Sequence, residues 1–167
     1  MKISININSR LKELEVKPNE TLLSALRNNG YTEVKCGCSE GECGACLVLL
    51  DEKPVNSCQV LAMSIRNKQV KTVKGIGTLY LPHLIQKAFV EAGADQCGFC
   101  SPGMIVASYS ILKETGNRPS KEDIRRGLDG NLCRCTGYVK IIEAVGMAAE
   151  KSLQEETQKP EAVCTNM

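Results

Sequence analysis

Residues 36–46 read CGCSEGECGAC, and this stretch decides the fold because it gathers four cysteines on one short loop. Three of these thiols, those of Cys38, Cys43 and Cys46, follow the spacing C-x4-C-x2-C, and Cys58 follows further along the chain. The loop also contains Gly37, Gly41 and Gly44. Glycine adopts positive φ without steric cost, so these positions can turn backbone N–H groups toward a bound anion. The stretch therefore predicts a loop folded around thiolates and the metal that they bind.

The spacing of this first quartet favours an iron–sulfur cluster. C-x4-C-x2-C with a distant fourth cysteine is the plant-type ferredoxin spacing of a [2Fe–2S] cluster. Three thiolates on one tight loop hold one side of a small cluster, and the fourth closes it from another segment. The alternative is a tetrahedral zinc site, although zinc is usually held by two separated C-x2-C-like knuckles.

Charge and hydropathy argue against two classes of protein. The net charge is +2, and the longest basic clusters are pairs such as Arg125-Arg126, which indicates a mixed surface rather than a nucleic-acid site. The N-terminus alternates apolar and polar residues without the apolar core of a signal peptide, and no stretch approaches a membrane span. We therefore expect a cytoplasmic protein, in which ten cysteines favour metal binding over disulfides.

A second quartet consists of Cys97-x2-Cys100 and Cys133-x-Cys135. Each pair falls at a junction between predicted helices, so two loops can meet at one end of a helical bundle. Cys100 precedes a helix expected to begin at Pro102, where the helix dipole favours a thiolate. Two alternatives stay open. A redox-active dithiol at 97–100 would need a βαβ setting, and a second zinc site would have an unusual C-x-C knuckle.

Three residues lie outside these quartets. Cys36 is expected to be a small buried side chain near the first quartet, and the alternative is that it competes as a ligand. Cys164 is expected to be a free thiol in a C-terminal tail. His83 follows Pro82 at a helix start and is interpreted as a surface residue rather than a ligand.

The first half of the chain has the pattern of an α+β domain built on a small mixed sheet. Alternating apolar residues within 3–16 predict a hairpin. Asn19 is the expected cap of a short helix that Gly30 ends. The apolar run 47–50 predicts a central strand, and 70–73 predicts a last, edge strand.

The second half has helical periodicity. After a linker at 76–81, four helices are expected, the second beginning at Pro102 and the third at a capping box formed by Ser120 and Asp123. The domains are expected at 1–75 and 82–153, and residues 154–167 are expected to form a disordered tail.

Taken together, the two quartets resemble the iron–sulfur subunit of the molybdenum hydroxylases, a family that includes xanthine dehydrogenase, aldehyde oxidoreductase, carbon monoxide dehydrogenase and nicotinate dehydrogenase. The stretches that carry the resemblance are VKCGCSEGECGACLVLLDEKPVNSC (34–58), QCGFCSPGM (96–104) and GNLCRCTGYVKI (130–141). The departures are Ser101, where threonine is common, and the added thiol of Cys36.

The resemblance implies a ferredoxin-like (β-grasp) domain followed by a four-helix domain, each with one [2Fe–2S] cluster. The implied ligands are Cys38, Cys43, Cys46 and Cys58 for the first cluster, and Cys97, Cys100, Cys133 and Cys135 for the second. It further implies that Gln96 and Cys135 approach a molybdopterin on a large partner subunit, and that the first cluster lies toward a flavin, expected as FAD on a medium partner subunit.

The function implied by the resemblance is electron transfer within a molybdenum-dependent oxidoreductase. Because the chain ends after the second quartet, we expect the separate small subunit of a multi-subunit enzyme, with no bond chemistry and no catalytic residue of its own. The alternative is a freestanding ferredoxin-like carrier, which the mildly basic net charge disfavours.

Overall fold

The alternating apolar residues of the N-terminus form the first hairpin of a sheet in the computed structural model, which describes residues 1–158. Two strands, β1 (Lys2–Ile7) and β2 (Arg10–Glu15), pair antiparallel and are joined by Asn8 and Ser9. Both turn residues have positive φ, 51° and 64°, as the favoured two-residue hairpin turns require. The predicted hairpin is therefore confirmed.

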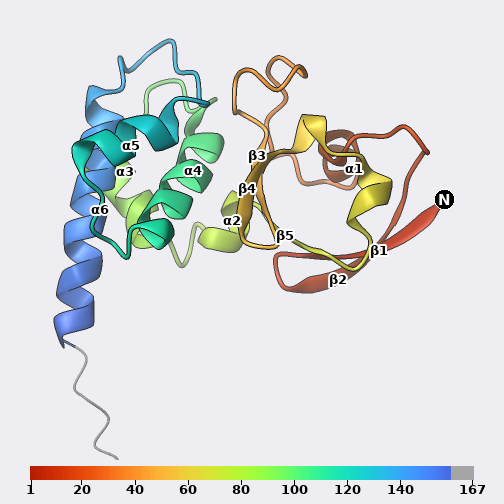
Figure 1. Cartoon of the computed structure of the whole chain (residues 1–167), viewed down its shortest axis with the longest axis horizontal. Helices are drawn as coiled ribbons and strands as arrows, with labels where there is room; N and C mark the ends of the chain where they lie inside the picture. Colours follow the sequence, from red (N-terminus) through yellow and green to blue (C-terminus); the bar gives the residue numbers. More distant parts are fainter. Residues whose placement is uncertain (159–167) are drawn as a thin grey trace, which may run out of the picture.

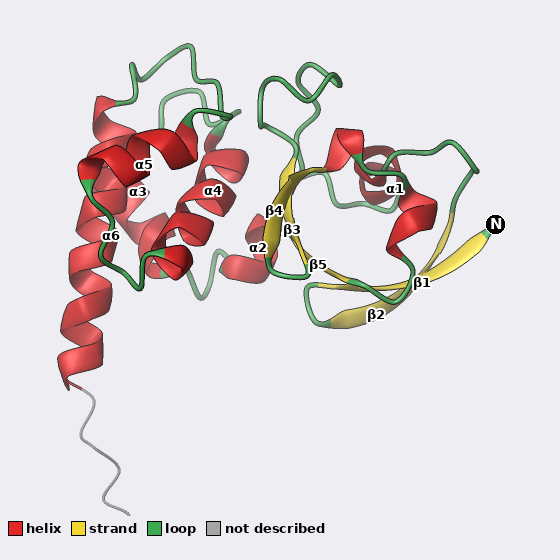
Figure 2. Ribbon diagram, viewed as in Figure 1, coloured by secondary structure: helices red, strands yellow, loops and turns green. Residues whose placement is uncertain are grey.

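Three further strands complete a mixed sheet (Figure 2). They are β3 (Leu47–Leu50), β4 (Lys53–Asn56) and β5 (Gln69–Lys71). The strand order is β2-β1-β5-β3-β4, so β5 lies in the middle, parallel to β1 and antiparallel to β3. The prediction of an edge strand at 70–73 is wrong, and Val73 instead begins a short helix, α2 (Val73–Ile76). Strand β5 has only three residues, and its local sequence does not indicate which strands will pair with it. Tertiary packing decides the pairing.

Helix α1 (Leu22–Asn28) packs against this sheet and closes the first hydrophobic core. The largest contributions to this core come from Ile3, Ile5, Ile7, Leu22, Leu26 and Ile65. The N-cap is Thr21, whose hydroxyl accepts a hydrogen bond from the Ser24 amide at 3.2 Å, rather than the predicted Asn19. Gly30, with φ of 88°, follows the helix as expected for a terminating glycine.

The second half of the described chain folds into the predicted bundle of helices (Figure 1). These are α3 (Leu84–Glu91), α4 (Ser101–Glu114), α5 (Lys121–Leu128) and α6 (Val139–Gln158). The predicted capping box opens α5: Ser120 accepts from the Asp123 amide, and the Asp123 carboxylate accepts from the Ser120 amide. The inward faces of these helices form a second hydrophobic core around Phe89, Ile85, Met104 and Val145.

Strand β3 connects the two cores because both of its faces are covered. Val48 lies in the first core, whereas Leu47 packs against the helical core. A strand covered on both faces needs no polar alternation, which explains the uninterrupted apolar run at 47–50. Helix α4 lies against β3 and β4, and Glu52, in the turn between these strands, pairs with Lys71 and with Lys113 of α4 at 2.6 Å each. The two domains therefore meet over a continuous contact.

The C-terminal boundary differs from the prediction. Helix α6 continues to Gln158, past the start of the tail expected at 154. The rest of that expected tail, 159–167, lies outside the described residues, as does Cys164. Over residues 1–158, none of the helices is long and apolar enough to cross a membrane.

Candidate metal centres

The first quartet lies where the glycine-rich loop meets the segment after β4. Cys46 and Cys58 are buried at the border of the first core, whereas Cys38 and Cys43 are half-buried. Ser57 fixes the two segments together, because its hydroxyl donates a 2.7 Å hydrogen bond to the Cys46 carbonyl. The structure thus brings the segment of Cys58 against the loop that carries the other three predicted ligands.

Glycine is required in this loop for two different reasons. Gly41 and Gly44 adopt positive φ, 88° and 67°, as the sequence predicted. Gly37 does not have positive φ, but a Cβ atom there would lie 2.7 Å from the Cys43 sulfur. At Gly37 the requirement is therefore space for a thiol rather than backbone conformation.

The thiols of the first quartet meet in two pairs. The Cys38 side chain interacts with that of Cys43, and the Cys46 side chain interacts with that of Cys58. Burial raises the pKa of the Cys46 thiol to about 11, since a thiolate loses hydration there. The pair Cys46 and Cys58 is therefore the inner, buried pair, and the pair Cys38 and Cys43 is the outer, half-buried pair.

Backbone N–H groups surround the outer pair. The Glu40 amide donates to the Cys38 sulfur at 3.4 Å, and together with the Cys43 amide it lowers the pKa of Cys38 to about 7. On the buried side, the Gln59 side-chain amide donates to the Cys58 sulfur at 3.4 Å. Donors aimed at sulfur stabilise a thiolate, as the sequence led us to expect of this loop.

The second quartet lies in the loops that precede α4 and α6. The sulfurs of Cys97 and Cys135 are 3.6 Å apart, and the Cys100 side chain interacts with that of Cys133. Burial raises the pKa of Cys100 to about 12, and contact with Cys97 raises the pKa of Cys135. Cys97 and Cys135 are exposed, whereas Cys100 and Cys133 are half-buried, so this quartet also has an inner and an outer pair.

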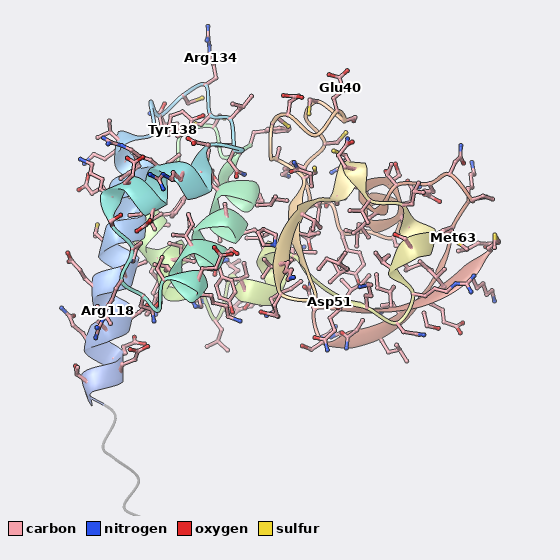
Figure 3. The ribbon with its side chains drawn as sticks, viewed as in Figure 1. Glu40, Asp51, Met63, Arg118, Arg134 and Tyr138 are labelled. Carbon is pink, nitrogen blue, oxygen red and sulfur yellow. The ribbon has the colours of Figure 1, made fainter. Side chains whose placement is uncertain are left out.

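Two side chains after the C-x-C motif hold its loop. The Thr136 hydroxyl donates to the Cys133 sulfur at 3.1 Å; although burial alone would raise the pKa of Cys133, this bond and backbone amides lower it overall. The Tyr138 hydroxyl accepts from the Cys133 amide and donates to the Asn131 carbonyl, each at 3.0 Å. Tyr138 itself has φ of 68° and lies below the loop tip that Arg134 marks (Figure 3).

The separation of the Cys97 and Cys135 sulfurs fits two thiolates on one metal ion. Two thiolates on one tetrahedral ion, at about 2.3 Å each, lie about 3.8 Å apart, close to the observed distance between Cys97 and Cys135. Two such pairs side by side match the four thiolates of a [2Fe–2S] cluster. Across residues 1–158, no three His, Cys, Asp or Glu side chains converge on a point suited to one metal ion, and the nine cysteines are free thiols.

The two cysteine loops lie at the same end of the molecule. Figure 3 shows Glu40 at the tip of the first loop and Arg134 at the tip of the second, both projecting to one side. At their bases the loops touch directly, because the Leu132 amide donates a 3.0 Å hydrogen bond to the Cys43 carbonyl. One backbone hydrogen bond thus connects Cys43, a predicted ligand of the first quartet, to Leu132, the residue before Cys133.

The other residues singled out from the sequence take varied positions. Gln96 is exposed next to Cys97, which leaves it accessible to a partner. Cys36 is exposed rather than buried as expected, with its sulfur 3.2 Å from the Ser39 hydroxyl. His83 is half-buried rather than on the surface, and its Nδ1 caps α3 by accepting from the Ile85 amide at 3.2 Å.

Sequence reasoning missed the residues that support the thiols. Gln59, Thr136 and Tyr138 act on the ligand loops, yet polar side chains of this kind are common on any surface. Their only signal is that each lies within five residues of a predicted ligand. Asn131 is buried where the two loops meet, and its local sequence does not predict a contact with Gly44.

Comparison with known proteins agrees with this geometry. Residues 5–71 match the family described as "2Fe-2S iron-sulfur cluster binding domain", and residues 72–146 match the "[2Fe-2S] binding domain". The nicotinate dehydrogenase small FeS subunit of Eubacterium barkeri is 44% identical over 150 residues, which cover 89% of this chain and 95% of that protein. The chain belongs to the iron–sulfur subunits of the molybdenum hydroxylases.

Two further matches define the extent of the likeness. The chain superimposes on a chain of quinoline 2-oxidoreductase from Pseudomonas putida 86 with a TM-score of 0.87 and 39% identity, covering 93% of this chain and 98% of that one. Xanthine dehydrogenase of Blastobotrys adeninivorans is 44% identical over 138 residues, but these are 76% of this chain and only 10% of that protein. The same two-domain unit therefore occurs both as a small chain and as part of a much longer one.

The family assignment confirms the predicted fold and the predicted class of function. The chain has a ferredoxin-like domain followed by a helical [2Fe–2S] domain. It is the electron-transfer component of an oxidoreductase complex and carries [2Fe–2S] clusters.

Proposed function

We propose that the eight cysteines of the two quartets hold two [2Fe–2S] clusters, each with one iron on the inner and one on the outer thiol pair. The irons of the first cluster would be bound by Cys38 with Cys43 and by Cys46 with Cys58. Those of the second would be bound by Cys97 with Cys135 and by Cys100 with Cys133. The 3.6 Å approach of the Cys97 and Cys135 sulfurs is the observation that carries this proposal.

The clusters supply reversible one-electron chemistry when bound, and the chain's own residues tune and position them. Glu40, Gln59 and Thr136 direct N–H or O–H groups at the ligand sulfurs, which stabilises negative charge there. Of the inner pairs, Cys46 with Cys58 is buried in the first core, and Cys100 with Cys133 is half-buried against the second. Burial and sulfur hydrogen bonds are the means by which a protein sets the potential of such a centre.

The orientation of the subunit in its complex follows from exposure. Cys97, Cys135 and Gln96 are open to solvent, so this side of the second quartet is the one that a molybdopterin-containing large subunit would cover. The first quartet would then lie toward an FAD-containing medium subunit. A complex of this kind would operate in the cytoplasm.

Metal and sulfide analysis of the anaerobically purified chain tests the proposal, together with electron paramagnetic resonance (EPR) after dithionite reduction. We expect about four iron and four sulfide per chain and two distinct rhombic signals. Zinc without sulfide, or a single cluster, would contradict it. Cys58→Ser should remove only the signal of the first cluster, and Cys133→Ser only that of the second.

A further inference from the structure

The contact between the two cysteine loops is built around one buried amide side chain. Asn131 is 4% exposed, and its Nδ2 donates a 3.1 Å hydrogen bond to the carbonyl of Gly44, 87 positions earlier. The backbone amide of Asn131 donates to the Leu128 carbonyl, and its carbonyl accepts from the Tyr138 hydroxyl. The backbone of Asn131 is therefore fixed within its own loop, while its side chain binds the other loop.

Glycine packing shows how closely the loops approach here. A Cβ atom on Gly44 would lie 2.3 Å from the Gly130 carbonyl oxygen and 2.6 Å from Asn131 Nδ2. A Cβ atom on Gly103, in the first turn of α4, would lie 2.3 Å from the Gly44 carbonyl oxygen. Gly103 makes room for the Gly44 carbonyl that Asn131 binds, and Gly44 makes room for the Gly130 carbonyl and the Asn131 side chain, so three segments converge on Gly44.

We propose that Asn131 is a positioning residue that fixes the separation of the two cysteine quartets. The proposal rests on the ligand sets given above. The Leu132–Cys43 hydrogen bond lies next to the Asn131–Gly44 bond, so losing the second would loosen the first. Electron tunnelling and magnetic coupling between two centres both weaken steeply with distance. The Asn131 side chain would thus affect electron transfer and magnetic coupling between the two quartets, and not the properties of either quartet alone.

The first test replaces the donor without changing the shape. Asn131→Asp removes the Nδ2 donor and sets a carboxylate oxygen against the Gly44 carbonyl. In the full chain carrying both clusters, we expect hydrogen exchange of the 128–134 segment to rise about tenfold. The spin–spin splitting between the two reduced clusters should fall, while the signals of the individual clusters persist.

The second test opens the same contact from the other side. Gly103→Ala adds a methyl group 2.3 Å from the Gly44 carbonyl oxygen, which must move away, whereas alanine itself suits α4 as a helix former. It should reduce the splitting in the same direction as Asn131→Asp. Gly146→Ala in α6 is the matched control, because a Cβ there meets nothing within 4 Å, and its splitting should equal that of the wild type.

A second control separates positioning from general loop support. Asn56 donates to the Gly41 carbonyl at 2.9 Å and so holds the same glycine-rich loop from within its own domain. Asn56→Asp should shift the signal of the first cluster and leave the splitting intact. Equal losses of splitting in Asn56→Asp and Asn131→Asp would overturn the proposal. So would unchanged exchange and splitting in both Asn131→Asp and Gly103→Ala, whereas a wild-type chain without two clusters would refute the proposed function instead.

Discussion

The amide of Leu132 donates a 3.0 Å hydrogen bond to the carbonyl of Cys43, across an interface between two domains with separate hydrophobic cores. Leu132 is bonded to Cys133, so one hydrogen bond is the only non-covalent link between two ligand residues of different quartets along this path. An electron-transfer protein benefits from such a short connection because it keeps two centres close while each retains its own surroundings.

Ligand identity can be separated from mere proximity with two cysteine variants. Cys135→Ser should abolish the EPR signal of the second cluster and leave that of the first, since Cys135 shares an outer pair with Cys97. Cys36→Ser should keep both signals, because Cys36 is exposed and its sulfur contacts Ser39 rather than another thiol. Loss of the first signal in Cys36→Ser would mean that the first ligand set is misassigned.

The hydroxyl of Thr136 should raise the reduction potential of the second cluster. Its hydrogen bond to the Cys133 sulfur favours the more negative, reduced form. Thr136→Val should therefore lower the midpoint potential by on the order of 50 mV, and Thr136→Ser, which keeps the donor, should change it little. Redox titration followed by EPR measures both. An equal shift in the two variants would attribute the effect to packing.

Tyr138 should stabilise the loop that carries Cys133. Tyr138→Phe leaves the half-buried Cys133 amide and Asn131 carbonyl without their shared partner, which should cost ~1–3 kcal/mol of unfolding free energy. Thermal unfolding, and the rate at which a chelator removes iron, report the loss. Tyr80→Phe is the control, because Tyr80 is 92% exposed and should have no measurable effect.

The stability of the helical domain should depend on pH in the mildly acidic range through His83. Burial, aided by the charge of Lys87, lowers the pKa of His83 despite the opposing effect of Glu155, and its neutral Nδ1 caps α3. The folded state thus prefers the neutral ring. The stabilisation that neutral His83 gives to the folded state is fully present above its unfolded pKa of about 6.5, and it is lost as pH falls through its lower folded pKa.

A substitution isolates this contribution. Asn caps a helix without titrating, so His83→Asn should remove the pH dependence while preserving most of the ~1 kcal/mol that a cap supplies. Thermal unfolding of both proteins at several pH values between about 5.5 and 7.5 gives the comparison. Parallel curves for the two proteins would show that other groups cause any decline.

Much of the local structure was predictable because it depends on neighbours in the sequence. The alternation at 3–16 specified a hairpin, and Ser120 with Asp123 specified a helix start. The local signal failed at the start of α1, where Asn19 was the expected cap and Thr21 is the observed one, since both side-chain types can cap a helix and only packing of α1 on the sheet selects the position.

The sequence by itself determined that the cysteines are clustered on short glycine-containing loops, and from their spacing it predicts two quartets. Only the tertiary structure decided that Cys97 meets Cys135 and Cys100 meets Cys133, that β5 lies in the middle of the sheet, and that Asn131 reaches Gly44. These contacts join residues from distant parts of the chain. The thiol contacts depend on how the helices of the bundle pack, and the Asn131–Gly44 contact depends on how the two domains meet, and no local pattern encodes either arrangement.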